Sequence, residues 1–277
     1  MSSIIKLYRN GLTAGVCPSV HAGGAKRGKV GGWSPYSVRS NTRFLYSVHA
    51  DRLTGVGYSF TFTIRHCPES SEDWHKARRR LVERFRYLRM VRLHWLTEWQ
   101  RRMVPHLHGV VFFDPESEVC ATRMLDGWLA VAAEWAPSGG AQTVAPLYDS
   151  LGWFKYLSKH AARGLRHYQR SPEMIPPGWS GRTGRMWGAL GDWPRDDSVD
   201  LQLSMPAFHA LRRLVRSRRK AAARAEGNPA RISHARRMLK CNDRKSSSVR
   251  GLSDWIDLED SLAVLEPLRR QGYSIVQ

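Results

Sequence analysis

Apolar positions recur at two spacings along the middle of the chain, and these spacings predict strands and helices. Residues 58–64 place an aromatic or aliphatic side chain at every second position between serines and threonines, which is typical of a half-buried strand. Residues 70–88 begin with serines and acidic residues and then repeat apolar side chains at helical spacing, which predicts an amphipathic helix with a basic outer face. Residues 91–99 and 106–113 predict two more strands, which a tight turn must make antiparallel neighbours.

Three further helices and one short strand complete this pattern. The helices are expected at residues 34–53, 117–136 and 149–163, and a short edge strand at residues 143–148 tolerates its proline. The predicted order is helix, strand, helix, two strands, helix, strand and helix. This order is typical of an α+β fold, in which a central antiparallel sheet is flanked by helices. We assign this domain to residues 33–195.

Both ends of the chain differ from this domain in composition. Residues 1–32 combine glycine and positive charge where a core element would need periodic apolar positions, which predicts a basic flexible arm. Residues 196–277 predict a basic helical region, with helices at residues 208–227 and 232–240. The last stretch, residues 252–277, is acidic and is expected to dock back on the basic helices.

The charge of the chain points to a polyanionic partner. The 277 residues hold 44 Lys and Arg against 24 Asp and Glu, a formal charge of +20, and residues 205–250 alone contribute +12. Nucleic acid is the first candidate partner for so basic a protein. With 42% hydrophobic residues and 11 tryptophans, the chain is too apolar to be wholly disordered.

No sequence feature indicates a membrane or an oxidising compartment. The chain has no run of 18 apolar residues that could span a bilayer, and its first residues lack the pattern of a signal peptide. Its four cysteines are 50 or more residues apart, which matches neither a zinc knuckle nor a compact disulfide framework. We therefore expect a protein of the cytoplasm.

The most distinctive polar pattern is His106-Leu107-His108 on one of the predicted strands. Side chains at positions i and i+2 of a strand point to the same face, so the two imidazoles converge. Such a pair is a candidate metal site, although the same spacing also occurs as polar surface or as satisfied core histidines.

Glu98 lies near the end of the preceding predicted strand, which the hairpin brings beside the two histidines. One carboxylate and two imidazoles around a point leave positions open for substrate, as in a catalytic rather than a structural metal site. Alternatively, Glu98 pairs only with Arg101 or Arg102. Imidazole ligands suit transition metals and carboxylate suits Mg²⁺ or Mn²⁺, so the spacing alone does not select the ion.

A third candidate is the pair Tyr156 and Lys159 on the predicted helix at residues 149–163. Positions i and i+3 are neighbours on one helix face. Tyrosine, with a pKa of about 10, is a poor nucleophile at neutral pH, but a nearby cation stabilises its phenolate and the charge that develops on an attacked phosphate. The alternative is a buried aromatic ring beside a lysine whose stem lies on apolar surface.

Taken together, these motifs resemble the HUH-type rolling-circle replication endonucleases, particularly the initiators of filamentous phages and small bacterial plasmids. The resemblance covers about residues 33–195 and rests on five segments in chain order: SPYSVRSNTRFL (34–45), YSFTFTI (58–64), EWQRRMVPHLHGVVFF (98–113), FKYLSKH (154–160) and GRTGRMWG (181–188). No second tyrosine follows Tyr156 at helical spacing, so the chain resembles the single-tyrosine members. The implied fold is the RRM-like sandwich of that family.

The resemblance also implies a mechanism and a set of partners. His106, His108 and Glu98 would hold Mg²⁺ or Mn²⁺ against the scissile phosphate of single-stranded DNA at a replication origin, which a hairpin can present. Tyr156 would attack the phosphorus, leaving a free 3′-hydroxyl for a host polymerase and a 5′-phosphotyrosine on the protein, while Lys159 neutralises the developing charge. No nucleotide cofactor is required, and unwinding is left to a host helicase in the bacterial cytoplasm.

Two other classes of function remain open from the sequence. A transposase or a plasmid-mobilising relaxase of the same superfamily would share these motifs. A non-enzymatic basic DNA-binding protein would carry the histidine pair incidentally.

Overall fold

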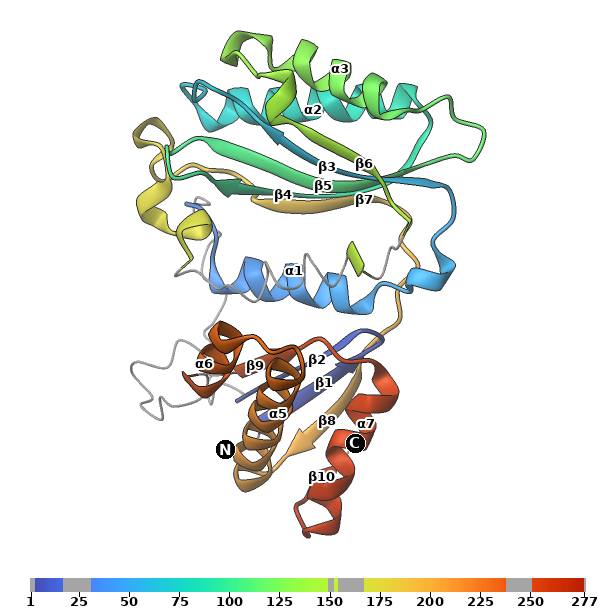
Figure 1. The fold of residues 1–277 in the computed structure, drawn as a ribbon, viewed down its shortest axis with the longest axis vertical. Coiled ribbons are helices and arrows are strands. Elements are labelled where there is room, and N and C mark those ends of the chain that lie inside the picture. The colour runs from blue at the N-terminus through green and yellow to red at the C-terminus, as the bar shows by residue number, and fades with distance from the viewer. Residues whose placement is uncertain (1–2, 17–30, 149–151, 154–166, 238–250, 277) are drawn as a thin grey trace, which may run out of the picture. The chain divides into compact units, whose positions relative to one another are not determined.

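The computed structural model describes residues 3–16, 31–148, 152–153, 167–237 and 251–276. The chain forms two compact units, each built on a five-stranded antiparallel sheet (Figure 1). The site unit comprises Lys26–Leu45 and His49–Arg195, and the basic unit comprises Met1–Ala25, Tyr46–Val48 and Asp196–Gln277. The predicted α+β class, with antiparallel sheets and flanking helices, is confirmed.

The sheet of the site unit contains all the strands predicted for residues 33–195 and one that was not predicted. Its order is β6 (Thr143–Pro146), β3 (Val56–Thr63), β5 (Pro105–Phe113), β4 (Met90–Trp99) and the unpredicted edge strand β7 (Trp187–Gly191). Figure 1 shows α2 (Ser71–Tyr87) and α3 (Ala121–Val131) on one face and α1 (Pro35–Ser47) on the other. The helix predicted at 149–163 lies almost wholly outside the described residues.

The two faces of this sheet differ because β3 alternates aromatic and hydroxyl side chains. Phe62 stacks on Trp128 of α3 with ring centroids 5.2 Å apart, and Phe60 meets Phe85 of α2 at 5.8 Å. Full burial of one such ring stabilises the fold by roughly 1.5–3 kcal/mol. A Cβ on Gly109 would lie 2.2 Å from the ring of Phe60, which explains why a glycine follows the histidine pair. One aromatic cluster therefore lies between the sheet and α2 and α3, and the opposite face carries polar residues as well as further aromatic rings.

His94 is a fully buried polar residue on that opposite face. Its ring stacks on Phe44 at 5.2 Å with an interplanar angle of 7°, and its Nε2 donates to Asn41 Oδ1 at 2.8 Å. Burial lowers the pKa of His94 to about 3, because the charged imidazolium would lose its hydration. The folded chain therefore holds this imidazole neutral.

We expect His94 to make the site unit less stable as the pH falls below about 6.5, the pKa of an unperturbed histidine. Below that pH the imidazole of His94 binds a proton in the unfolded chain, whereas in the folded chain it stays neutral down to about pH 3. The free energy of unfolding should fall by about 2 kcal/mol between pH 7 and pH 5 through this residue. Urea unfolding at both pH values should show this loss in the wild type and in the exposed-site variant His209→Gln. A His94→Gln variant with the same pH dependence would contradict the prediction.

The basic unit contains the largest departure from the predicted organisation. Residues 3–16, within the segment predicted as a flexible arm, form the hairpin of β1 (Ser3–Tyr8) and β2 (Gly11–Val16) in the middle of a sheet. The strand order is β10 (Ile275–Val276), β8 (Val199–Leu203), β1, β2 and β9 (Gly251–Asp254). β1 pairs with β8, so strands from opposite ends of the chain complete one another. The arm prediction is therefore wrong for these residues, because tertiary pairing supplies the partners that their local sequence lacks.

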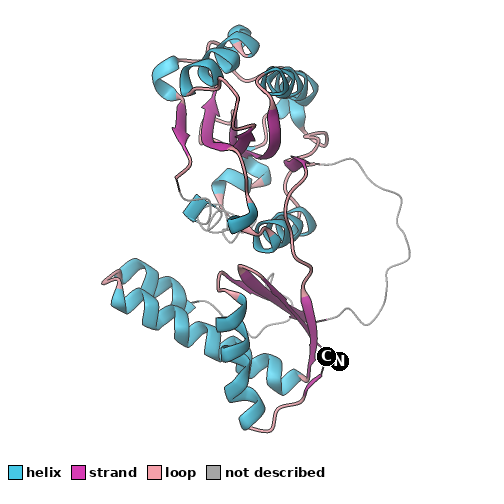
Figure 2. Cartoon of the chain, turned by 90° about the vertical axis from the view of Figure 1, so that its right-hand side faces the viewer, coloured by secondary structure: helices cyan, strands magenta, loops and turns pink. Residues whose placement is uncertain are grey.

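The basic unit has three helices in its described residues; the first and third pack on one face of this sheet, and the second packs against the first (Figure 2). They are α5 (Met205–Ala225), α6 (Pro229–Arg237) and α7 (Leu258–Arg270), and the buried side chains of α5 and α7 meet those of β1, β2 and β8. The predicted docking of the acidic last stretch is confirmed by two ion pairs, Arg218 with Asp260 at 3.4 Å and Arg219 with Asp254 at 2.8 Å. No helix in the described part of the chain is long and apolar enough to cross a membrane.

Candidate functional site

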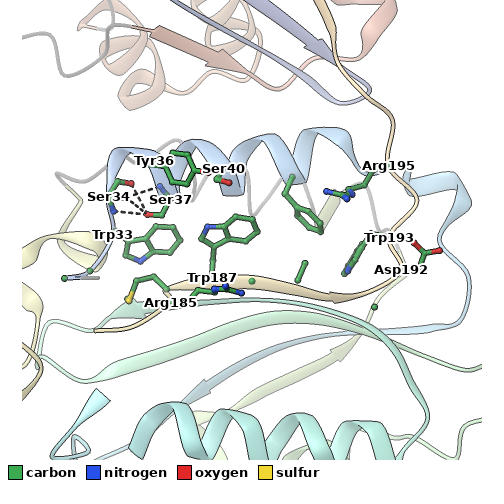
Figure 3. A pocket seen from close by; sticks show the side chains of 17 residues that line it. Trp33, Ser34, Tyr36, Ser37, Ser40, Arg185, Trp187, Asp192, Trp193 and Arg195 are labelled. Carbon is green, nitrogen blue, oxygen red and sulfur yellow. Dashed lines mark hydrogen bonds between the residues drawn. The ribbon is translucent and has the colours of Figure 1, made fainter. Parts of the chain in front are cut away.

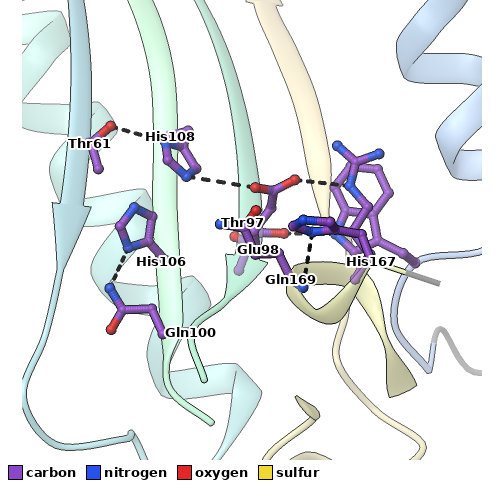
Figure 4. Close-up of polar contacts among 10 residues, drawn as sticks. Thr61, Thr97, Glu98, Gln100, His106, His108, His167 and Gln169 are labelled. Carbon is purple, nitrogen blue, oxygen red and sulfur yellow. Dashed lines mark hydrogen bonds and ion pairs between the residues drawn. The ribbon is translucent and has the colours of Figure 1, made fainter. Parts of the chain in front are cut away.

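The polar face of the site-unit sheet brings the predicted histidine pair and Glu98 together (Figure 4). Glu98 on β4 is directly opposite His106 on β5, and β3 places Thr63 opposite His106 and Thr61 opposite His108. Directly opposed residues of antiparallel strands share a face of the sheet, so these five side chains lie on one surface. The convergence expected from the hairpin is therefore present.

The three predicted ligand residues lie within contact of one another. The rings of His106 and His108 have centroids 4.3 Å apart, and Nε2 of His108 lies 3.7 Å from Oε2 of Glu98. Thr61 Oγ1 forms a hydrogen bond with Nδ1 of His108 at 3.0 Å, which leaves Nε2 as the nitrogen that faces the carboxylate. Glu98 is 1% exposed and His108 7%, whereas His106 is half-buried, so the cluster extends from the protein interior to the surface through His106.

Glu98 has a second partner that the sequence did not indicate. Nε of Arg170 donates to Oε1 of Glu98 at 2.9 Å, and both side chains are 1% exposed. The two sequence-neighbouring arginines are engaged elsewhere: Arg102 donates to Gln100 Oε1 and to the carbonyl oxygen of Ile64, and Arg101 lies over the ring of Tyr168. Nothing in the local pattern around Arg170 distinguishes it from a surface arginine.

Replacing Arg170 by methionine is expected to destabilise the site unit by about 3–5 kcal/mol, because Glu98 would remain as a buried charge without its cation. Adding Glu98→Gln should restore most of that loss, since no buried charge then remains. Urea unfolding measures both effects. Arg89→Met, which removes surface pairs with Asp114 and Glu116, is the control and should change stability by less than about 1 kcal/mol. A loss for Arg170→Met no larger than for this control would contradict the assignment.

A short relay sets the hydrogen-bonding state of His106. Arg102 Nε donates to Gln100 Oε1 at 2.8 Å, which directs the amide nitrogen of Gln100 to donate to Nδ1 of His106 at 2.7 Å. Since Nδ1 accepts, the neutral ring carries its proton on Nε2. A metal ion on that nitrogen would require the proton to leave and the Gln100 amide to turn.

The donor chemistry of this cluster suits a divalent cation, but the cluster is not arranged as a finished metal site. Two imidazoles and one carboxylate are appropriate ligands for transition metals or Mn²⁺. Within the described residues, however, no group of three His, Cys, Asp or Glu side chains has an arrangement that could hold a metal ion. The chemistry of His106 and His108 fits that of metal ligands. The carboxylate of Glu98 is paired with Arg170, so it could serve as a ligand only after it turns away from the arginine.

The predicted nucleophile and its cation, Tyr156 and Lys159, lie outside the described residues, so their positions relative to the histidines stay a prediction. Two other tyrosines of this region are described. Tyr148 is 94% exposed, and Tyr168 is 39% exposed, with its ring centroid 4.7 Å from that of His167.

Comparisons with known proteins place the whole chain among replication proteins. No family model and no solved structure matches the chain. A protein of Xylella fastidiosa (strain 9a5c) that carries the name of a replication protein is 45% identical over 280 residues, covering 98% of both chains. The replication-associated protein of Pseudomonas phage Pf3 is 41% identical over 278 residues, covering 98% of this chain and 99% of that one. The chain therefore belongs to the family of replication proteins that includes the replication-associated protein of phage Pf3.

Proposed function

We propose that this protein initiates DNA replication by nicking and rejoining single-stranded DNA at a replication origin. The observation that carries the proposal is the histidine pair converging with Glu98 on one sheet face, in a chain whose full-length relatives are named for replication. The formal charge of +20 supports a nucleic-acid substrate. The proposed place of action is the cytoplasm of the bacterial host, where a host helicase and polymerase would continue the reaction.

In the proposed reaction, the oxygen of Tyr156 attacks the phosphorus and the bond to the 3′-oxygen breaks. This leaves a free 3′-hydroxyl and a 5′-phosphotyrosine, and Lys159 neutralises charge on the attacked phosphate. His106 and His108, with Glu98 once it turns from Arg170, would hold Mg²⁺ or Mn²⁺, which supplies charge stabilisation at the phosphate when bound. A later 3′-hydroxyl attacks the phosphotyrosine, releases Tyr156 and reseals the strand, so no nucleotide cofactor is consumed.

A covalent-adduct assay tests this function. The full-length protein is incubated with labelled single-stranded origin oligonucleotides and Mn²⁺, with and without EDTA, and then run on a denaturing gel. The proposal predicts a protein–DNA band that forms only with the metal and only with origin sequence. Binding without such a band would support a non-enzymatic DNA-binding protein instead.

The basic unit is expected to contribute affinity for DNA rather than chemistry. Arg213, Lys220 and Arg224 lie on the face of α5 opposite its buried positions, at spacings i, i+7 and i+11. Replacing all three by glutamine should weaken DNA binding and lower the slope of log K against log salt by roughly 2, since each phosphate contact contributes about 0.7–0.9. Fluorescence anisotropy with labelled DNA between about 50 and 200 mM salt measures the slope.

The matched control for this slope neutralises three arginines that are already paired. Arg86, Arg89 and Arg123 form exposed ion pairs with acidic neighbours in the site unit. Their triple glutamine variant carries the same charge change and should leave the slope nearly unaltered. Equal slopes for the two triple variants would show that the α5 face does not contact DNA. Truncation before residue 200 is unsuitable, because it removes the strand that pairs with β1.

A further inference from the structure

An aromatic pocket of about 780 Å³ lies in the site unit between α1 and the edge strand β7 (Figure 3). Its aromatic lining residues are Trp33, Tyr36, Phe44, Trp187 and Trp193. Arg185 and Arg195 also line it, and Asp192 is the one acidic residue among the described lining residues. The pocket therefore combines flat rings with net positive charge.

The rings of the aromatic pocket divide into a buried support and an accessible surface. Phe44 is 7% exposed and lies against Trp193 with centroids 5.3 Å apart. Tyr36 is 72% exposed, and Trp187 is half-buried with its ring 5.9 Å from that of Phe44. A solvent-exposed tyrosine beside a supported tryptophan offers surfaces on which unpaired bases can stack. Arginines at the same pocket can then meet the phosphates that link those bases.

A second hollow, the arginine pocket of about 600 Å³, adjoins the same edge strand. Its lining residues are Ser71, Glu72, His75, Arg78, Arg79, Arg182, Gly184 and Arg185. Arg185 lines both pockets, so they meet at the start of β7. Four arginines against a single glutamate make this hollow a site for an anion.

The loop that carries Arg182 and Arg185 is held on α2 by two hydrogen bonds. Ser71 Oγ donates to the carbonyl oxygen of Arg182, and His75 Nε2 donates to that of Thr183 at 2.8 Å. A Cβ on Gly184, whose φ is +66°, would lie 2.1 Å from Nε2 of His75. Both the conformation and the close contact therefore require glycine at this position. The GRTGR part of segment 181–188 thus fixes two exposed arginines beside α2.

The arginines of this pocket are close enough to disfavour one another's charge. The guanidinium carbon of Arg78 lies 3.7 Å above the centroid of the Trp95 ring. Burial, together with the neighbouring charges of Arg79 and Arg185, lowers the pKa of Arg78 to about 10. Within the described residues, the buried Nε of Arg78 has no hydrogen-bond partner. A phosphate entering the pocket would relieve this repulsion and accept charge-assisted hydrogen bonds.

The aromatic pocket connects to the candidate site through Trp33. The indole nitrogen of Trp33 donates to the carbonyl oxygen of Thr97 at 2.9 Å, and its ring lies 4.2 Å below the guanidinium carbon of Arg170. Arg170 in turn pairs with Glu98. A strand seated in this pocket therefore lies beside the side chains that surround Glu98 and the histidines.

We propose that an unpaired DNA strand crosses the site unit at the β7 edge. Its bases stack on Tyr36 and Trp187 in the aromatic pocket, a phosphate binds in the arginine pocket, and Arg185 contacts the backbone between them. The identification of DNA as the ligand rests on the proposed function. The proposal gives segment 181–188 a role in holding the strand near the candidate site.

Binding of a fluorescein-labelled single-stranded origin oligonucleotide to the full-length protein, without metal, tests the proposal by anisotropy. Tyr36→Ala should weaken binding roughly 5- to 160-fold, the range for loss of stacking on one base. Arg185→Ala should weaken binding and lower the salt slope by about 0.7. Tyr87→Ala, at an 89% exposed tyrosine outside both pockets, and Arg123→Ala are the matched controls and should bind within twofold of wild type.

A series of oligonucleotides with single abasic positions separates stacking from general charge. Removal of the base at one position should weaken binding by the wild type but not by Tyr36→Ala, because that base is the one that the Tyr36 ring contacts. Variants that bind like their controls, or that lose duplex and single-strand affinity equally, would overturn the proposal.

The covalent-adduct assay keeps this proposal separate from the proposed function. Nicking by the wild type together with unaltered binding by Tyr36→Ala and Arg185→Ala would overturn only the strand path. Loss of binding by both variants in a protein that forms no adduct would support the strand path and reject the nicking activity.

Discussion

The Tyr156→Phe variant is expected to lose DNA cleavage and the covalent adduct together. The substitution removes one oxygen and little volume, so the fold should change modestly while the proposed nucleophile is absent. Of the nine tyrosines, Tyr156 alone combines a predicted helix, a lysine three residues later and a position after the histidine strand. Denaturing gels of reactions with labelled origin oligonucleotide and Mn²⁺ measure cleavage and adduct at once.

Two described tyrosines supply the controls for this prediction. Tyr148→Phe and Tyr168→Phe should form the adduct at wild-type levels, since neither is followed by a lysine one helical turn later. Peptide mapping of a trapped adduct should place the nucleotide on the fragment containing residues 155–159. An adduct on Tyr148 or Tyr168, or one that persists in Tyr156→Phe, would reject Tyr156 as the nucleophile.

His106→Ala and His108→Ala are each expected to reduce metal-dependent cleavage below detection while DNA binding stays largely intact. In the proposed function the imidazoles would hold the metal, whereas phosphate contacts would come from arginine and lysine elsewhere. Titration of Mn²⁺ in the cleavage assay and anisotropy without metal separate the two effects. His209→Ala, at an exposed histidine of α5, is the control and should cleave normally.

Glu98 requires a milder substitution than alanine, because truncation would leave the buried guanidinium of Arg170 without its carboxylate. Glu98→Gln keeps an oxygen that can accept from Arg170, and combined with Arg170→Met it leaves no unpaired buried charge. This double variant should fold, and it should shift cleavage to higher Mn²⁺ concentrations if the carboxylate contributes to the metal site. A double variant of His106 and His108 that still cuts in a metal-dependent way would show that the metal lies elsewhere.

Local periodicity accounts for most of the site unit. Strands β3, β4 and β5, of 8, 10 and 9 residues, and helix α2, of 17 residues, follow from apolar positions that recur at strand or helix spacing. The convergence of Glu98 with His106 also follows locally, since a tight turn between two strands leaves little choice of register. Strand β7 was missed because its five residues, WGALG, carry no clear alternation.

The partner of Glu98 could not be predicted by the same reasoning. Arg101 and Arg102 are its neighbours in sequence, yet Arg170 occupies the buried position 72 residues later. Ion pairing depends on which side chains meet in space. Glu98 lies at the buried end of β4, and the exposed arginines that follow it in the sequence are turned away from its carboxylate. The sequence therefore indicated a carboxylate at the site but not the cation that controls it.

The hairpin at residues 3–16 shows the same distinction at the level of a whole unit. Its glycines and charges are typical of an irregular segment, and its few apolar side chains, among them Ile5 and Leu7, become a core only against α5 and β8. By itself, the sequence determined the elements whose own periodicity buries one face, and with them the histidine strand. Only the tertiary structure decided the second sheet, the Arg170 pair and the two pockets at β7, because each depends on contacts between segments far apart in the chain.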